Sequence, residues 1–201
     1  MMQDFNPSNL QEMTELIILS LTGVAALVTE FFNLRKMMLP LAILALAVVG
    51  WLSYGHMDFV EPIYGMAQLD AFAGKFFMVL CTLGILWFWG FRRFFEEENT
   101  TSDYFALTLF SFAGAACMVS YTNLAMLFLG VEILSIPVYV LAGSRKTDVK
   151  SNEASFKYFL LGAFSSCFLL LGIALLYGAT GTFDLAQIKS QTASLTPDNQ
   201  L

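Results

Sequence analysis

The chain has 201 residues, of which 57% are hydrophobic and 13% are charged, and its formal net charge is −6. About a quarter of the residues in soluble domains are charged, so this composition excludes an ordinary soluble domain and favours an integral membrane protein. The net charge predicts no basic partner, because the charges of a membrane protein lie in loops at two opposite faces. We expect the lipid bilayer as its surroundings and no nucleic-acid partner.

Six apolar stretches follow one another along the chain, each near the roughly 20 residues that a helix needs to cross about 30 Å of hydrocarbon. They cover Thr14–Phe32, Met37–Tyr54, Ala71–Phe91, Tyr104–Tyr121, Leu124–Gly143 and Ala154–Gly178. Residues 1–13 are polar and acidic, unlike a cleaved signal peptide, so the first stretch is expected to stay as an anchor. The predicted fold class is an all-α integral membrane protein with a bundle of six transmembrane helices.

Basic residues gather in alternate loops of this predicted bundle. They are Arg35 and Lys36, then Arg92 and Arg93, then Arg145, Lys146 and Lys150. The positive-inside rule places these loops in the cytoplasm, so both ends of the chain are expected on the outer side. The acidic loop with Asp58, Glu61 and Asp70 then faces outward. The polar residues 179–201 are expected to form a loosely ordered tail.

Small residues recur on two of the predicted helices, and such faces let helices approach closely. They are Ala113, Ala116, Cys117 and Ser120 on the fourth stretch and Gly162, Ser166 and Gly172 on the sixth. Helix-on-helix packing is therefore expected rather than isolated anchors.

The sequence shows no pattern typical of a metal or redox centre. Cys81, Cys117 and Cys167 each lie in an apolar stretch without a CxxC pair, and His56 is the single histidine. Zinc and iron–sulfur sites need several such ligands together, and no glycine-rich nucleotide motif occurs. We expect this chain by itself to carry no redox cofactor and no metal.

Glu132 is the strongest candidate for chemistry, because it lies near the middle of the fifth stretch. A charged residue at a helix centre costs about 2.5–3.5 kcal/mol on insertion scales, so its side chain must face protein or water. Pro137, five residues on, cannot donate to the carbonyl of Ile133, which predicts a kink and a freed acceptor nearby. Two interpretations stay open: a functional carboxylate, or a neutral structural residue bonded to a neighbouring helix.

Lys157 is the second candidate and lies early in the sixth stretch, after a helix-start signal at Ser151 and Asn152. It can serve function, or it can reach the cytoplasmic surface and pair with Glu153 at i, i+4. Direct contact between Lys157 and Glu132 is not expected, because Lys157 lies about 7 Å and Glu132 about 16 Å from the cytoplasmic end of its own helix. The remaining charges near helix ends, Glu15, Glu30, Asp70 and Lys75, are expected to be solvated anchors.

Three segments resemble a known family. They are Leu127–Gly143 (LFLGVEILSIPVYVLAG), Glu153–Gly162 (EASFKYFLLG) and Ala174–Gly181 (ALLYGATG). They look like the fifth and sixth helices of the antiporter-like subunit N of bacterial NADH:quinone oxidoreductase, the counterpart of mitochondrial NADH dehydrogenase subunit 2. The likeness is dense over residues 104–185, whereas residues 1–103 agree mainly in span pattern and loop charge.

The resemblance implies a role in proton translocation. In that family a glutamate of the fifth helix works with a lysine of the seventh, and further lysines continue a polar path through the membrane. Glu132 matches that glutamate and Lys157 matches a lysine typical of the sixth helix, so Glu132 is expected to be a switchable charge on a proton path and Lys157 an intermediate on its cytoplasmic side. The physical basis is that a carboxylate and an ammonium stabilise each other's charged forms when they are close. Electron transfer, with its FMN, iron–sulfur clusters and quinone, is expected in other membrane-arm and peripheral-arm subunits of the complex.

Members of that family have more than a dozen helices in two inverted repeats. The expected organisation here is therefore helices one to three in residues 1–103, helices four to six opening the first repeat in 104–178, and the polar tail in 179–201. A part of a longer subunit of the bacterial cytoplasmic membrane is expected. Two alternatives stay open: a subunit of a related cation/proton antiporter or membrane-bound hydrogenase, or a truncated structural or assembly protein.

Overall fold

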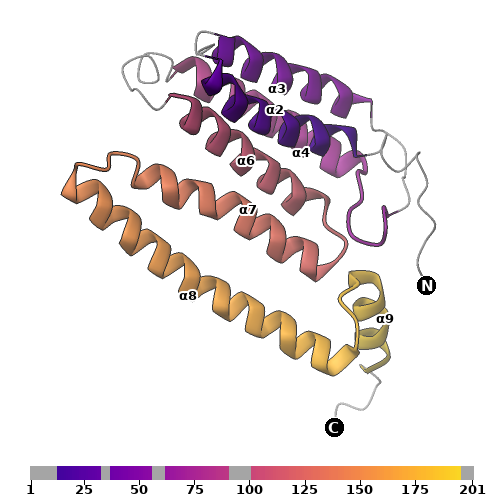
Figure 1. Ribbon diagram of the computed structural model, residues 1–201. Coiled ribbons are helices and arrows are strands. Elements are labelled where there is room, and N and C mark those ends of the chain that lie inside the picture. Colours follow the sequence, from indigo (N-terminus) through magenta and orange to yellow (C-terminus); the bar gives the residue numbers. More distant parts are fainter. Residues whose placement is uncertain (1–12, 33–36, 56–61, 91–100, 196–201) are drawn as a thin grey trace.

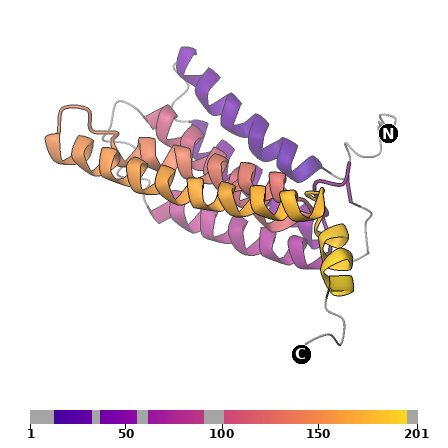
Figure 2. The ribbon, with the colours of Figure 1, turned by 90° about the horizontal axis from the view of Figure 1, so that it is seen from below.

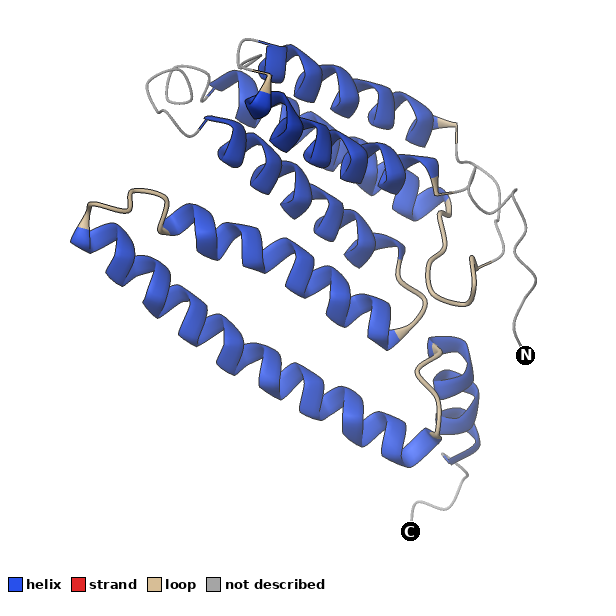
Figure 3. Cartoon of the chain, viewed as in Figure 1, coloured by secondary structure: helices blue, strands red, loops and turns tan. Residues whose placement is uncertain are grey.

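A computed structural model describes residues 13–32, 37–55, 62–90 and 101–195 as a set of seven helices (Figures 1 and 3). They are α2 (Thr14–Phe31), α3 (Met38–Tyr54), α4 (Ala71–Gly90), α6 (Thr101–Ser120), α7 (Leu124–Ala142), α8 (Val149–Thr180) and α9 (Leu185–Leu195). No strand occurs within the described ranges, where only isolated bridges join loops. The predicted all-α class is confirmed.

Each of the six predicted stretches coincides with one helix. Among the described residues, α4, α6, α7 and α8 are long and apolar enough to cross a membrane, and α2 and α3 are shorter apolar helices. Several residues used to predict the orientation and the loops lie outside the described residues: Arg35, Lys36, His56, Asp58, Glu61, Arg92 and Arg93.

The helix formed by the sixth stretch differs most from its predicted bounds, Ala154–Gly178, and α6 starts three residues before the predicted Tyr104. The sixth stretch becomes α8, which starts at Val149 because the Asp148 side chain accepts a hydrogen bond from the Lys150 N–H at 2.9 Å and caps the helix. The helix ends at Thr180, and the left-handed φ of 70° at the next residue, Gly181, suits a glycine C-cap. It has 32 residues.

The tail that was expected to be loosely ordered contains a further helix, α9. The Asp184 carboxylate accepts from the Gln187 N–H at 2.9 Å and caps it. Its buried Ile188 joins Leu124 and Ile173 in a small cluster beneath the ends of α7 and α8. Figures 1 and 2 both show α9 lying across the end of α8. Tertiary contact, which local polarity does not reveal, orders this segment.

The helices are arranged in successive layers (Figure 1). Helices α2, α3, α4 and α6 share the main apolar core, in which Phe77, Phe88 and Phe105 are fully buried. The rings of Phe88 and Phe105 stack with centroids 4.9 Å apart and join α4 to α6. Helix α7 packs on α6 and α8 packs on α7, so α8 lies at the edge of the described fold.

Small residues allow the close contact between α6 and α7. A Cβ added at Gly114 would overlap the backbone of Leu134, and one at Gly130 would lie 2.8 Å from the Met118 side chain. The Ser111 hydroxyl also donates to the Leu134 carbonyl at 3.0 Å. The face of small residues predicted on the fourth stretch lies on α6 and is buried, since Ala116 and Ser120 are 1% and 2% exposed.

Three connections meet at one end of the bundle. The Gln68 N–H donates to the Ser120 carbonyl at 2.6 Å and the Thr122 N–H to the Met66 carbonyl at 2.9 Å. The Leu124 N–H donates to the Phe183 carbonyl at 2.9 Å. The α3–α4, α6–α7 and α8–α9 connections therefore lie on the same side, and the α7–α8 loop lies at the opposite end (Figure 1).

Candidate functional site

Glu132 lies in α7 with its side chain half-buried. Its Oε1 atom is buried, and no residue of the described part donates a hydrogen bond to it. Phe128 and Tyr139, four residues before it and seven after it, fall on the same helix face. Phe128 packs against the cluster around Ile173, and the Tyr139 ring contacts α8. The carboxylate therefore faces the interface between α7 and α8.

Pro137 is buried inside α7, one helical turn or so from Glu132. Because proline has no N–H, the Ile133 carbonyl loses the donor that a helix would give it. The neighbouring Leu134 carbonyl instead accepts from Ser111 of α6. A backbone acceptor without its helical partner thus lies next in sequence to the carboxylate, as the sequence predicts.

Lys157 lies in α8, and its Nζ atom donates to Glu153 Oε1 at 2.5 Å. The two side chains are 68% and 58% exposed, and the pair has i, i+4 spacing. The face of α8 that meets α7 is a different one. Its buried and half-buried residues recur every three, four or seven positions: Ser151, Ser155, Gly162, Ser166, Leu169 and Ile173.

A helix turns by about 100° per residue, so Lys157 points away from that face. The structure pairs Lys157 with Glu153, which is the second interpretation that the sequence left open. Direct contact with Glu132 was not expected from the sequence, and the ion pair of Lys157 is made elsewhere.

Of the charges predicted to be solvated anchors, Asp70 lies at a helix end as a cap and Glu15 is buried. Asp70 caps α4, because its carboxylate accepts from the Ala73 N–H at 2.8 Å. Glu15 is only 1% exposed, so the prediction that it is solvated is wrong. It lies close enough to Cys81 of α4 to interact electrostatically. The packing of α2 against its neighbours buries this side chain, although the residue lies in the first turn of the helix.

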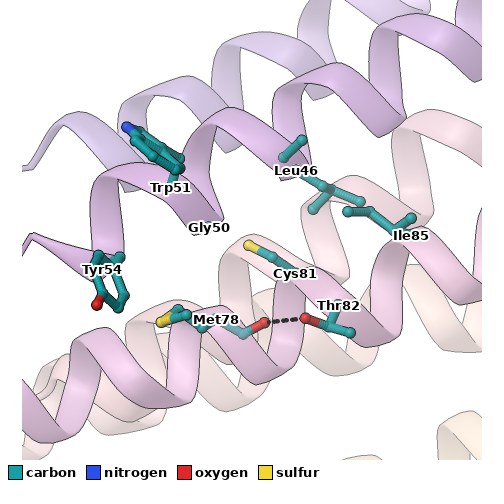
Figure 4. A pocket seen from close by; sticks show the side chains of 9 residues that line it. Leu46, Gly50, Trp51, Tyr54, Met78, Cys81, Thr82 and Ile85 are labelled. Carbon is teal, nitrogen blue, oxygen red and sulfur yellow. Dashed lines mark hydrogen bonds between the residues drawn. The ribbon is translucent and has the colours of Figure 1, made fainter.

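Two of the cavities are lined mainly by apolar side chains. A depression of about 360 Å³ between α3 and α4 is lined by apolar side chains with Cys81 and Thr82 (Figure 4). The Thr82 hydroxyl in it donates to the Met78 carbonyl of its own helix at 2.8 Å. A larger apolar groove of about 770 Å³ runs between α4, α6 and α7. Neither of these two is lined by a charged residue, whereas a third cavity of about 270 Å³ near the α7–α8 loop has Asp103 and Lys146 in its lining. Glu132 remains the candidate site because it lies in the middle of an apolar helix and its Oε1 atom is buried.

The polar residues of the α7–α8 interface were not all evident from the sequence. Tyr139 and Ser155 were not singled out, and Ser166 was noted only as a small packing residue. The available signal was periodicity: Tyr139 follows Glu132 by seven residues, which places both on one helix face. Which face meets α8 depends on the tertiary structure.

The fold and the site define a class: a polytopic α-helical membrane protein with a carboxylate inside the membrane at a helix interface, a feature typical of ion and proton pathways. Residues 120–200 match the family described as NADH:quinone oxidoreductase/Mrp antiporter, TM. The part of the chain that holds α7, α8 and α9 therefore carries the sequence pattern of this family.

The chain is similar to NADH-quinone oxidoreductase subunit N. The protein of that name from Cytophaga hutchinsonii is 44% identical over 189 residues, which are 92% of this chain and 41% of the relative. The subunit N of Flavobacterium johnsoniae is 42% identical over 184 residues, 90% of this chain and 40% of the relative. The chain thus spans about two fifths of the length of these curated relatives.

Solved structures agree with the fold. A chain in respiratory complex I from Thermus thermophilus matches with a TM-score of 0.73 and 26% identity, over 85% of this chain and 38% of that chain. A chain of the membrane-bound sulfane sulfur reductase, an archaeal respiratory membrane complex, matches with a TM-score of 0.70 and 22% identity over 94% of this chain and 40% of that one. The latter likeness shows the fold alone.

Proposed function

We propose that the chain is a membrane-arm subunit, or a part of one, of an NADH:quinone oxidoreductase that couples electron transfer from NADH to quinone with proton translocation. The observation that supports this function is the carboxylate of Glu132, half-buried in the α7–α8 interface of an antiporter-type fold. The relatives named subunit N supply the identity of the complex.

Glu132 acts in this proposal as a switchable charge on the proton path. A buried carboxylate holds its negative charge only with a cation or hydrogen-bond donors nearby, so the movement of a partner makes it take up or release a proton. Lys157 is an intermediate on the cytoplasmic side, reached when its exposed pair with Glu153 opens. The Lys157–Glu153 pair is exposed to solvent, and exposed ion pairs contribute little free energy, so breaking it costs little.

The redox chemistry belongs to partner subunits. The complex as a whole would supply FMN, iron–sulfur clusters and quinone, and this chain would contribute proton movement in contact with membrane-arm and peripheral-arm subunits. We place it in the bacterial cytoplasmic membrane with the α7–α8 loop, which carries Arg145 and Lys146, in the cytoplasm. The α3–α4 connection and both ends of the chain then lie on the outer side.

Substitution of Glu132 tests the function. Glu132→Gln keeps the size of the side chain and removes its charge, so proton translocation by the assembled complex is expected to stop while the complex still assembles. Proton transfer by one positioned group contributes about 100-fold or more to rate, so the loss should be easily measured. The measurement is the quenching of a pH-sensitive dye as membrane vesicles acidify after NADH is added, with NADH oxidation recorded in parallel.

The matched control is Glu132→Asp, which keeps a carboxyl group and should retain measurable translocation. Undiminished translocation in Glu132→Gln, with normal assembly, would contradict the proposal and favour a purely structural role for this chain.

A second candidate is a subunit of a cation/proton antiporter or of a membrane-bound hydrogenase, because the matching family includes the Mrp antiporters as well. Dependence on sodium separates the two. Transport that requires sodium and proceeds without NADH would favour the antiporter, and sodium-independent transport driven by NADH would favour the oxidoreductase.

A further inference from the structure

The contact between α7 and α8 is polar along part of its length. The Ser155 hydroxyl of α8 donates to the Tyr139 carbonyl of α7 at 2.7 Å, and the Ser151 hydroxyl donates to the Ala142 carbonyl at 2.8 Å. The Tyr139 ring meets the Tyr158 ring edge-on with centroids 4.8 Å apart. Its hydroxyl group occupies the space that a Cβ would fill at Gly162. Tyr139 thus presents a hydroxyl inside the helix interface.

The register of the hairpin places Ser166 at the level of Glu132. Because α7 and α8 are antiparallel, Tyr139 lies opposite residues 155–162, and Phe128 belongs to the cluster of Leu169 and Ile173. Glu132 lies between Phe128 and Tyr139, so its neighbours on α8 lie between residues 162 and 169. Ser166 is half-buried there and follows Gly162 by four residues, which puts it on the face that meets α7.

The direction of helical side chains bears on how these groups can reach one another. Side chains lean toward the N-terminus of their own helix, so Tyr139 and Glu132 both lean along α7 in the same direction, and Ser166 leans along α8 toward Gly162. The Cα atoms of Tyr139 and Glu132 are about 10 Å apart along α7, and only the greater length of the tyrosine side chain shortens the distance between the two polar groups. Ser166 lies at the level of Glu132 across the hairpin contact, so its hydroxyl and ordered water are the groups suited to bridge the remainder.

One atom in this interface needs a donor. Glu132 Oε1 is buried, and no described residue donates to it, whereas buried carboxylate oxygens in proteins are as a rule hydrogen-bonded. The Ser166 and Tyr139 hydroxyls are side-chain donors that the register brings toward its level from the hairpin contact, and the half-buried Ser135 follows Glu132 by three residues on α7 itself. Lys157 lies on another face of α8 and is paired with Glu153.

We propose that Tyr139 and Ser166 are positioning residues for Glu132 and that the α7–α8 seam, defined as Glu132, Tyr139, Ser155 and Ser166, is the route by which Glu132 exchanges its proton with the cytoplasmic end of the hairpin. This inference rests on the proposed function of Glu132. The hydroxyls donate to the ionised carboxylate through ordered water.

The proton balance is simple. When Glu132 takes up a proton, its O–H becomes the donor and the hydroxyl accepts, because a hydroxyl group can do both. A hydroxyl that receives a proton on its oxygen passes its own proton to the next acceptor in the seam. No bond other than O–H forms or breaks, and no oxidant or reductant is required.

The test combines infrared spectroscopy with proton translocation. The carboxyl C=O band of protonated Glu132 is identified in the membrane-reconstituted chain by its disappearance in Glu132→Gln. Loss of a hydrogen bond raises the frequency of this band, so Tyr139→Phe and Ser166→Ala are expected to shift it upward. Each should also slow translocation by the assembled complex about fivefold, the factor that corresponds to about 1 kcal/mol for one hydrogen bond.

Two further variants keep the test decisive. Ser165→Ala is the matched control, because Ser165 is the serine next to Ser166 and is exposed. In this variant the frequency of the Glu132 carboxyl band and the rate of proton translocation should stay unchanged. Gly162→Ala fills the space of the Tyr139 hydroxyl, so it should reproduce the effect of Tyr139→Phe by a different physical change.

The outcomes separate this inference from the proposed function. If Glu132→Gln stops translocation while Tyr139→Phe and Ser166→Ala leave both the band and the rate unchanged, the inference is wrong and the function stands. If Glu132→Gln leaves translocation intact, the proposed function itself fails. A band shift in the two hydroxyl variants together with slower translocation supports both.

Discussion

The position of Glu132 has two parts, its depth along α7 and the direction of its side chain. Its depth follows from counting residues along an apolar stretch at about 1.5 Å each. Its direction follows from contacts: Phe128 and Tyr139 on the same face meet α8, whereas Gly130 and Leu134 meet α6. The same carboxylate on the opposite face would be pressed against the α6 backbone, with no room for the groups that could hold a proton.

Close packing at Gly114 gives a prediction at this scale. In Gly114→Ala the new Cβ meets the backbone of Leu134, which cannot move aside as a flexible side chain would. We expect the free energy of unfolding to fall by about 1–3 kcal/mol, as for other overpacked positions. Circular dichroism during denaturation in mixed detergent micelles measures it.

Gly172→Ala is the control for this prediction. A Cβ at Gly172 would have no atom within 4 Å, so the substitution should be neutral or raise the stability of the helix by about 0.5–1 kcal/mol. Equal destabilisation by the two substitutions would contradict the tight α6–α7 contact.

At the scale of elements, α8 is longer than a membrane crossing requires. Its 32 residues correspond to about 48 Å, compared with about 30 Å of hydrocarbon. The excess lets the first turns, with Lys150, Glu153 and Lys157, extend toward the aqueous phase, which fits the exposure of the Lys157 pair. The start of α8 at Val149 therefore places Lys157 in the part of the helix near the aqueous phase.

The α7–α8 hairpin is held where α7 ends. The last carbonyl groups of a helix have no partner within the helix, and Ser155 and Ser151 satisfy those of Tyr139 and Ala142. The double variant Ser151→Ala, Ser155→Ala should lose about 1 kcal/mol or somewhat more, given about 0.6 kcal/mol for an average interhelical hydrogen bond in a membrane. Hydrogen exchange should become faster in the last turn of α7, as measured by mass spectrometry.

Ser165→Ala again serves as the reference, since this exposed serine is not among the residues that bond to α7. If hydrogen exchange in the last turn of α7 is unchanged in the double variant, apolar packing alone holds the hairpin together. The two serine hydrogen bonds would then contribute nothing measurable to its stability.

At the scale of the whole molecule, hydrogen bonds join three connections at one end of the bundle. Backbone bonds link residues 66–68, 120–124 and 183–185, so these segments must lie on one side of the membrane. The α7–α8 loop with Arg145 and Lys146 lies at the other end. The charge distribution predicts that this second end is cytoplasmic.

Cysteine labelling checks this orientation. In a variant whose three native cysteines are replaced by serine, Met66→Cys should react with a membrane-impermeant maleimide added to intact cells with a permeabilised outer membrane. Lys146→Cys should react only after the inner membrane is opened. Met66 is 50% exposed and Lys146 is also exposed, so both sites are accessible in the fold. The reverse pattern would invert the proposed topology.

The sequence by itself determined the membrane class, the positions of the apolar helices and the place of Glu132 in the middle of one of them, because apolar length, helix caps and loop charge are local properties that each segment carries alone. Only the tertiary structure decided that Glu15 is buried, that Lys157 turns outward, that residues 185–195 form a helix and that the face of α7 with Tyr139 meets α8. These features depend on which faces of distant segments meet, and that is set by the packing of all the helices together.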